Sequence, residues 1–144
     1  MNIKQQRIAV ALTYAGTLPL ILSGLGAMAH ILSSADASRL TLTYRVIIVS
    51  FLAGIPWACY LFHVEKCPRN MLLTNNAVAL LSWSTLLVYP SPWSILLQIF
   101  CFLYLLVLDF KLTRAKILPT WLYAIRRSAT IIVVLMLSIM IGYA

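Results

Sequence analysis

The chain has 144 residues, of which 62% are hydrophobic and only 10% are charged, and its formal net charge is +8 at pH 7. Soluble domains carry about 25% charged residues, and a small chain has too much surface for its volume to bury so many apolar side chains in a water-soluble core. The composition therefore excludes a soluble globular domain. The basic residues lie in short runs beside apolar segments, so we expect anionic lipid head groups, not nucleic acid, as their counter-charge.

Five apolar segments predict five transmembrane helices. About 20 apolar residues span a hydrocarbon core about 30 Å thick, and lipid requires that each segment pairs its own backbone groups. Short links make consecutive helices antiparallel. We therefore expect an all-α polytopic membrane protein, a compact bundle forming one domain over residues 1–144. In chain order the segments cover about 8–32, 46–62, 71–89, 93–110 and 124–143.

Small residues recur every four positions in the first two segments, in 11–27 and in 50–58. Lipid supplies no hydrophobic drive for association, so stripes of small residues commonly mark close helix contacts. Pro19 and Pro56 each remove one helical hydrogen bond, so we expect kinks, which mostly serve packing but can free carbonyls to line a binding site. The predicted helix-packing residues are Ala15, Pro19, Ser23, Ser50, Gly54 and Ala58.

The fourth segment carries two polar residues, Gln98 and Asp109, which are eleven positions apart and so share one helix face. We predict that this polar face looks into the bundle. An acid within a membrane helix is a functional candidate. Asp109 lies at the helix end beside Lys111 and Arg114, however, and we interpret it as part of an interfacial salt bridge.

The stretch 111–127 interleaves cations with apolar and aromatic residues, a pattern typical of a segment at the level of the lipid head groups. We interpret it first as an ordinary positive-inside anchor, and alternatively as an interface for lipid or for a partner. The residues of this predicted interface are Lys111, Arg114, Lys116, Trp121, Arg126 and Arg127.

The sequence contains no recognisable reaction centre. His30 and His63 lie at opposite ends of the second segment, about 30 Å apart across a membrane, so they cannot share a metal or a haem. Cys59, Cys67 and Cys101 are odd in number and lack zinc-site spacing, so we expect free thiols. We predict no enzymatic activity, no catalytic residues, no cofactor and no metal.

All but two of the 11 basic residues lie on the side of the membrane that holds the N-terminus; the exceptions are Arg39 and Arg45. The positive-inside rule then predicts a cytoplasmic N-terminus and an external C-terminus. We expect Arg45 to snorkel or to pair with Asp36. No Arg-rich, Ser-rich transit segment precedes the first apolar run, which favours a bacterial inner membrane over a mitochondrial one.

Three stretches resemble a family of uncharacterised small five-helix membrane proteins that includes mitochondrial transmembrane protein 69. They are 14–19 (YAGTLP), Tyr44 with 48–57 (IVSFLAGIPW), and 119–127 (PTWLYAIRR) followed by Thr130. This chain departs from the family pattern at Ala53, Pro56 and Ala58. The resemblance implies a membrane location and no established reaction, so no catalytic role carries over.

We therefore expect a non-catalytic accessory, assembly or stabilising subunit of a larger inner-membrane complex, with a respiratory complex as one candidate. Its expected partners are other integral membrane subunits and lipids, including anionic phospholipid. The alternative is a small carrier or lipid-handling protein that acts as a homo-oligomer, suggested by Pro19, Pro56, Gln98 and the stretch 111–127. That alternative requires a wet, polar cavity between the first, second and fourth segments.

The predicted orientation is testable with reporter fusions at the C-terminus. Nine of the 11 basic residues are predicted on the side that holds the N-terminus, which keeps that side in the cytoplasm. An alkaline phosphatase fused after Ala144 should therefore be active in a bacterial inner membrane, and a green fluorescent protein at the same position should stay dark. A bright fluorescent fusion with inactive phosphatase would contradict this orientation.

Overall fold

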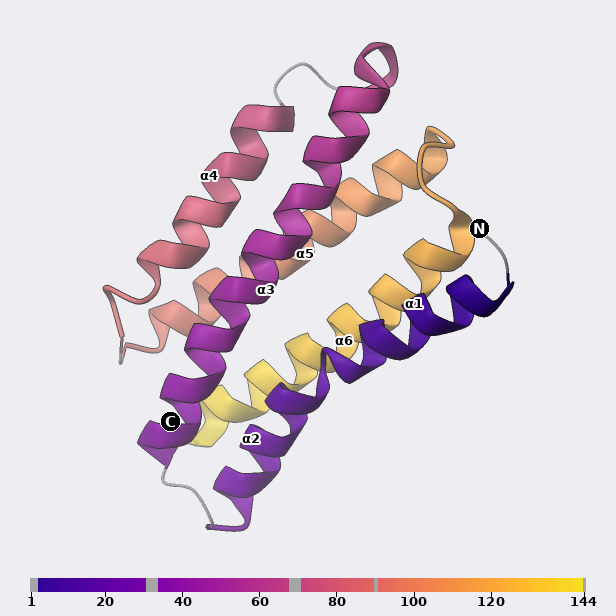
Figure 1. The fold of residues 1–144 in the computed structure, drawn as a ribbon. Helices are drawn as coiled ribbons and strands as arrows, with labels where there is room; N and C mark the ends of the chain where they lie inside the picture. The colour runs from indigo at the N-terminus through magenta and orange to yellow at the C-terminus, as the bar shows by residue number, and fades with distance from the viewer. Residues whose placement is uncertain (1–2, 31–33, 68–70, 90, 144) are drawn as a thin grey trace.

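The chain is all-helical in the computed structural model, which describes residues 3–30, 34–67, 71–89 and 91–143 (Figure 1). Within these ranges the side chains of 23, 24, 27, 34–38, 64, 140, 142 and 143 are not described. No strand occurs in the described ranges. The helices are α1 (Ile3–Ala15), α2 (Leu18–Met28), α3 (Ser34–Phe62), the short 3-10 helix η1 (Val64–Lys66), α4 (Met71–Ser84), α5 (Trp93–Arg114) and α6 (Thr120–Tyr143).

Three helices of the described part are long and apolar enough to cross a membrane, whereas the sequence predicted five. They lie at Arg39–Phe62 in α3, Trp93–Arg114 in α5 and Thr120–Ile139 in α6. The first predicted helix is divided into α1 and α2, each too short to span. The third predicted helix ends at Ser84, so that α4 has 14 residues and a length of about 21 Å, against about 30 Å of hydrocarbon.

The break between α1 and α2 follows from Pro19. Proline has no N–H to donate to the carbonyl of Ala15, and its ring clashes with that carbonyl, so a continuous helix is disfavoured there. Pro19 instead occupies the first turn of α2, where proline is well tolerated. At the break, the hydroxyl of Thr17 donates to the carbonyl of Tyr14 (2.7 Å) and the hydroxyl of Tyr44 donates to the carbonyl of Gly16 (2.7 Å). The Tyr44 contact fixes the break against α3.

This break sends α1 and α2 to different neighbours (Figure 1). The α2 helix packs against both α3 and α6, while α1 packs against α6 and diverges from α3. The α3 helix also contacts α4 and α5, and α5 contacts α6. Pro56 does not break its helix, because α3 continues through it to Phe62. The Pro56 side chain is buried.

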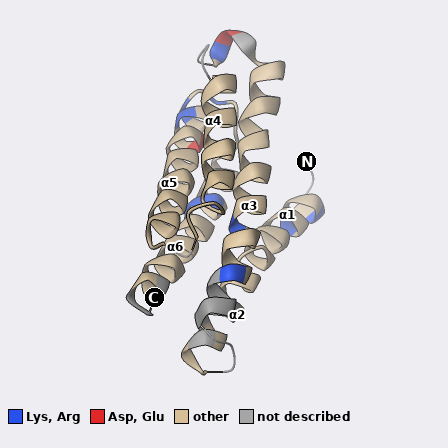
Figure 2. Cartoon of the chain, turned by 90° about the vertical axis from the view of Figure 1, so that its left-hand side faces the viewer, with Lys and Arg blue, Asp and Glu red and all other residues tan. Residues whose placement is uncertain are grey.

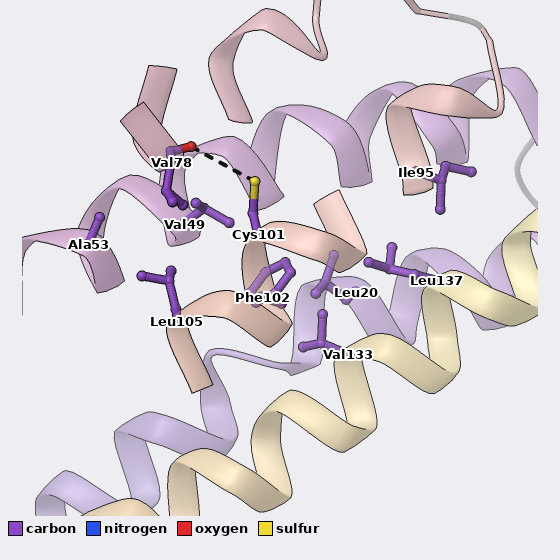
Figure 3. Packing of buried hydrophobic residues seen from close by; sticks show 10 residues of the cluster. All are labelled: Leu20, Val49, Ala53, Val78, Ile95, Cys101, Phe102, Leu105, Val133 and Leu137. Carbon is purple, nitrogen blue, oxygen red and sulfur yellow. Dashed lines mark hydrogen bonds between the residues drawn. The ribbon is translucent and has the colours of Figure 1, made fainter. Parts of the chain in front are cut away.

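The main core joins five helices and is almost wholly apolar (Figure 3). Cys101 of α5 is fully buried at its centre, and its thiol lies 3.8 Å from the carbonyl of Val78 on α4. A second, smaller cluster closes the end of the bundle near η1. The buried members of the main core are Leu20, Val49, Ala53, Val78, Ile95, Cys101, Phe102, Leu105, Val133 and Leu137.

The predicted small-residue packing faces point away from the bundle. Ser50, Gly54 and Ala58 are exposed on α3, and a Cβ added to Gly54 would meet nothing within 4 Å. Packing inside the chain instead uses a different face of α3, on which Val49, Ala53 and Cys59 are buried. Ala15 and Pro19 are also exposed, and the break between α1 and α2 interrupts that stripe; the side chain of Ser23 lies outside the described residues.

Two other helix boundaries differ from the sequence-based ones. The second predicted helix starts at Ser34 rather than near residue 46, since no proline or glycine interrupts 34–53 and polar residues can occupy the helix end that enters the head groups. The stretch 111–127 is not one interfacial segment. It comprises the end of α5, a turn in which Lys116 has φ 61°, and the start of α6 just after Pro119.

Replacing Tyr44 with Phe should loosen the break between α1 and α2. The Y44F variant loses the 2.7 Å hydrogen bond to the Gly16 carbonyl, and we expect the free energy of unfolding to fall by about 0.6–1.5 kcal/mol. Unfolding by sodium dodecyl sulfate in mixed micelles measures this. The matched control is Tyr14→Phe, at an exposed residue; equal losses in both variants would contradict the assignment.

Candidate functional site

A buried ion pair joins α5 to α6. Nη1 of Arg126 donates to Oδ1 of Asp109 at 2.9 Å, and the side chains are 7% and 2% exposed. Removing one member of such a pair leaves an uncompensated buried charge, which is costly in a low-dielectric interior. The pair therefore holds the two helices in one register.

The sequence assigned different roles to both members of this pair. Asp109 was expected to pair at the interface beside Lys111 and Arg114, but these two residues are exposed and Asp109 is buried. Arg126 was expected to face lipid head groups or a partner. A signal for its burial was present in the sequence: Arg126 shares a helix face with Thr130, Val133 and Leu137, at spacings of four, three and four.

An apolar pocket of about 380 Å³ lies beside the ion pair, within the range of about 300–1,000 Å³ that is typical of ligand sites. It opens at the surface of the bundle, because two of its lining residues, Leu12 and Phe51, are 66% and 69% exposed. Its walls come from α1, α3 and α6, with Leu20 of α2 and Phe102 of α5. The pocket lies where α1 diverges from α3.

Of the four polar side chains on the pocket wall, the two without a hydrogen bond to a nearby backbone carbonyl lie on α6. Arg126 and Thr130, one turn apart, both line it. Among the described residues, the Arg126 guanidinium bonds only to Asp109, and the Thr130 hydroxyl makes no hydrogen bond. The hydroxyls of Thr13 and Thr17, which also line the pocket, already donate to the carbonyls of Ala9 and Tyr14.

Gln98 belongs to a separate polar cluster between α4 and α5. Its Nε2 donates to the Thr85 hydroxyl at 2.9 Å and to the Ser82 carbonyl at 3.2 Å, and the Ser82 hydroxyl donates to its Oε1 at 3.2 Å. All three side chains are fully buried. Gln98 and Asp109 thus face the interior of the bundle but bind different partners, and Gln98 ties α4 to α5.

Arg45 is buried within the bundle, which contradicts the expectation that it snorkels. Its side chain is 1% exposed, and its Nε and Nη1 have no hydrogen-bond partner in the described part of the chain. The side chain of Asp36, its predicted partner, lies outside the described residues. Positions 36 and 45 of α3 are nine residues apart, which is about two and a half helical turns and about 13.5 Å of rise, so the two positions lie on opposite sides of the helix.

Four exposed basic residues, Lys111, Arg114, Lys116 and Arg127, lie around the turn from α5 to α6. Arg114 lies over the ring of Phe110 at 5.7 Å, and Arg127 lies over the ring of Tyr123 at 5.8 Å. In the view of Figure 2, α4 carries neither blue nor red, whereas α5 carries both toward its end. Lys111 and Lys116 are exposed and Trp121 is partly buried, so these residues remain candidates for an interface at the membrane surface, whereas Arg126 is buried and lines the pocket.

His30 and His63 lie at opposite ends of α3, the first before it and the second after it. The described residues contain no group of three or more His, Cys, Asp or Glu that could hold a metal. All three cysteines are free and buried. Burial raises the pKa of the Cys67 thiol, so the reactive thiolate is disfavoured there.

The three stretches that carry the family resemblance meet at the pocket. Gly16 and Thr17 come from the first stretch, 48–55 contributes from the second, and Arg126 and Thr130 come from the third.

A known family matches the chain over residues 5–142, under the description "Protein of unknown function (DUF3429)". The chain belongs to the DUF3429 family. No curated protein sequence matches this DUF3429 chain, and no solved structure matches it.

The buried pair predicts unequal effects of two neighbouring substitutions on α6. Arg126→Gln leaves the Asp109 carboxylate buried without its partner, and we expect a loss of about 3–5 kcal/mol in the free energy of unfolding. Arg127→Gln, on the exposed face, should cost less than about 1 kcal/mol, the value of its contact with Tyr123. Unfolding in mixed micelles measures both. Equal effects would mean that the Arg126 pair contributes no more than a surface contact.

Proposed function

We propose that this DUF3429 chain is a non-catalytic integral membrane protein that acts as an accessory, assembly or stabilising subunit of a larger inner-membrane complex. The observation that carries the proposal is the outer face of α3. Ser50, Gly54 and Ala58 form a shallow stripe there, flanked by Ile47 and Leu61, both more than 60% exposed. Close backbone approach through small residues is how membrane helices associate, and no other described helix of this chain covers the stripe.

The proposal includes five membrane crossings, with the N-terminus inside and the C-terminus outside. The broken pair α1 and α2 would cross together as one interrupted span, which lipid tolerates where neighbouring helices cover the break. The turn after α4 would extend that short helix toward the far surface. A bacterial inner membrane remains the favoured location, supported by the asymmetry of basic residues in the sequence.

Kinship with transmembrane protein 69 is part of the same proposal. It is supported by the three resembling stretches in the sequence, and residues from all three line one pocket. The family carries no established reaction, so this kinship adds a location and a fold but no chemistry.

A second candidate function, lipid handling, is favoured by the pocket itself. The sequence-based version required a wet, polar cavity between the first, second and fourth predicted helices. The pocket that the structure contains lies instead between the first, second and fifth predicted helices, and only Phe102 comes from the fourth. It is lined mainly by apolar side chains, which suits a hydrocarbon chain and does not suit a polar solute. Transport of a polar solute is therefore the less favoured form of this alternative.

The subunit proposal predicts that enlarging Gly54 separates the chain from its partners. Gly54→Leu should leave the fold intact, because the added side chain meets open space, and should lower the co-purified partner subunits about tenfold, equivalent to about 1.4 kcal/mol. The measurement is mass spectrometry and native-gel size after extraction of the membrane in mild detergent.

The matched control is Ala77→Leu, which enlarges an exposed small residue on α4. Partners retained equally by both variants would place the interface elsewhere. A wild-type chain that migrates alone in every mild detergent would overturn the subunit proposal.

A further inference from the structure

We infer that the pocket between α1, α3 and α6 binds one acyl chain of an anionic phospholipid, whose ester carbonyl is held by Arg126 and Thr130. The inference rests on the proposed membrane location and extends the lipid-handling candidate. It is independent of the proposed subunit role, since the site is complete within one chain.

The apolar lining of the pocket favours a hydrocarbon chain as its content. Ile48 to Ile55 on α3 and Arg126 to Val133 on α6 run along its walls, each about 10 Å of helix at 1.5 Å per residue. The pocket is lined mainly by apolar side chains, and its opening between Leu12 and Phe51 lies on the surface that would face lipid. An empty apolar pocket of this size would forfeit the dispersion contacts of all its lining atoms, so a lipid tail is its natural content.

The two ends of the pocket differ in polarity. Arg126 lies at the end nearer the start of α6, with Leu122 and Ile55, whereas Leu20, Ile48 and Val133 form the opposite, apolar end. A lipid tail enters with its tip toward Val133 and its polar end toward Arg126. This direction agrees with the exposed Lys111, Arg114 and Arg127, which lie around the turn from α5 to α6 at the Arg126 end.

The unused donors define the group bound at the polar end. Asp109 takes one N–H of Arg126, and no other described residue takes a further guanidinium N–H or the Thr130 hydroxyl. Because Asp109 already balances the charge of Arg126, these donors suit an uncharged acceptor such as an ester carbonyl. Donors left unpaired in an apolar site cost free energy, and the ester carbonyl removes that cost.

We expect the negatively charged phosphate of the lipid to lie outside the pocket, near the exposed basic residues. Lys111, Arg114 and Arg127 are exposed around the turn from α5 to α6, and each basic residue near an anionic membrane surface contributes about 1 kcal/mol of attraction. A phosphate attached to the ester at Arg126 would lie toward this cluster. An anionic phospholipid satisfies both the ester site and the cluster, whereas a free fatty acid has only one acidic group for the two.

The test is native mass spectrometry of the isolated full chain in mild detergent, titrated with phosphatidylglycerol or with phosphatidylcholine of the same acyl chains. We expect one tightly retained phosphatidylglycerol per chain and weaker retention of phosphatidylcholine. Ala129→Phe fills the pocket and should lower the retained fraction at least about tenfold. Ala124→Phe, on the exposed face of the same helix, should leave it unchanged.

Equal retention in both Phe variants would overturn the inference, and so would palmitic acid that displaces the phospholipid. If Ala129→Phe does not fold, as judged by its thermal unfolding, wild-type protein labelled by phosphatidylglycerol with a diazirine on its acyl chain decides the question. Labelling confined to peptides covering 12–20, 48–55 and 122–133 supports the pocket, and labelling spread over α4 excludes it. Since the isolated chain is used, a missing subunit partner cannot mimic either result.

Discussion

The buried pair of Asp109 and Arg126 is the interaction on which the rest of this structure depends. It lies between two of the three helices that are long enough to cross a membrane, and it fixes how α6 sits on α5. With α6 placed, Arg126, Thr130 and Val133 present one continuous wall to α1 and α3. The same pair neutralises a cation inside an apolar bundle, which lets an arginine line a pocket without a free counter-ion.

The break between α1 and α2 supplies the second constraint. Pro19 interrupts the helix and Tyr44 anchors the break to α3, so α2 stays with α3 while α1 follows α6. A straight first helix would pack against one neighbour along its whole length. The divergence creates the space that becomes the pocket. Pro19 therefore determines both how the first two helices pack and where the pocket forms. The outer face of α3 remains exposed, so the proposed lipid site and the proposed partner surface use different residues of one chain.

Much of the fold could be predicted from the sequence, because apolar runs and prolines act locally. Helical structure throughout and a change of direction near Pro19 follow from side-chain chemistry alone. The partner of Asp109 could not be predicted in this way, since Lys111 and Arg114 are nearer in sequence and only the packing of α6 on α5 selects Arg126. The small residues of α3 misled for a similar reason. Their spacing reveals a face suited to close approach but does not say whether the approaching helix belongs to the same chain.

A double-mutant cycle between Asp109 and Arg126 tests this account most directly. The free energies of unfolding of wild type, Asp109→Asn, Arg126→Gln and the double variant would be measured in the same mixed micelles. Because the double variant buries no unpaired charge, we expect it to be less destabilised than the sum of the single variants, with a coupling energy of about 0.5–3 kcal/mol. Strictly additive losses would contradict the account, since they would mean that the two side chains act independently.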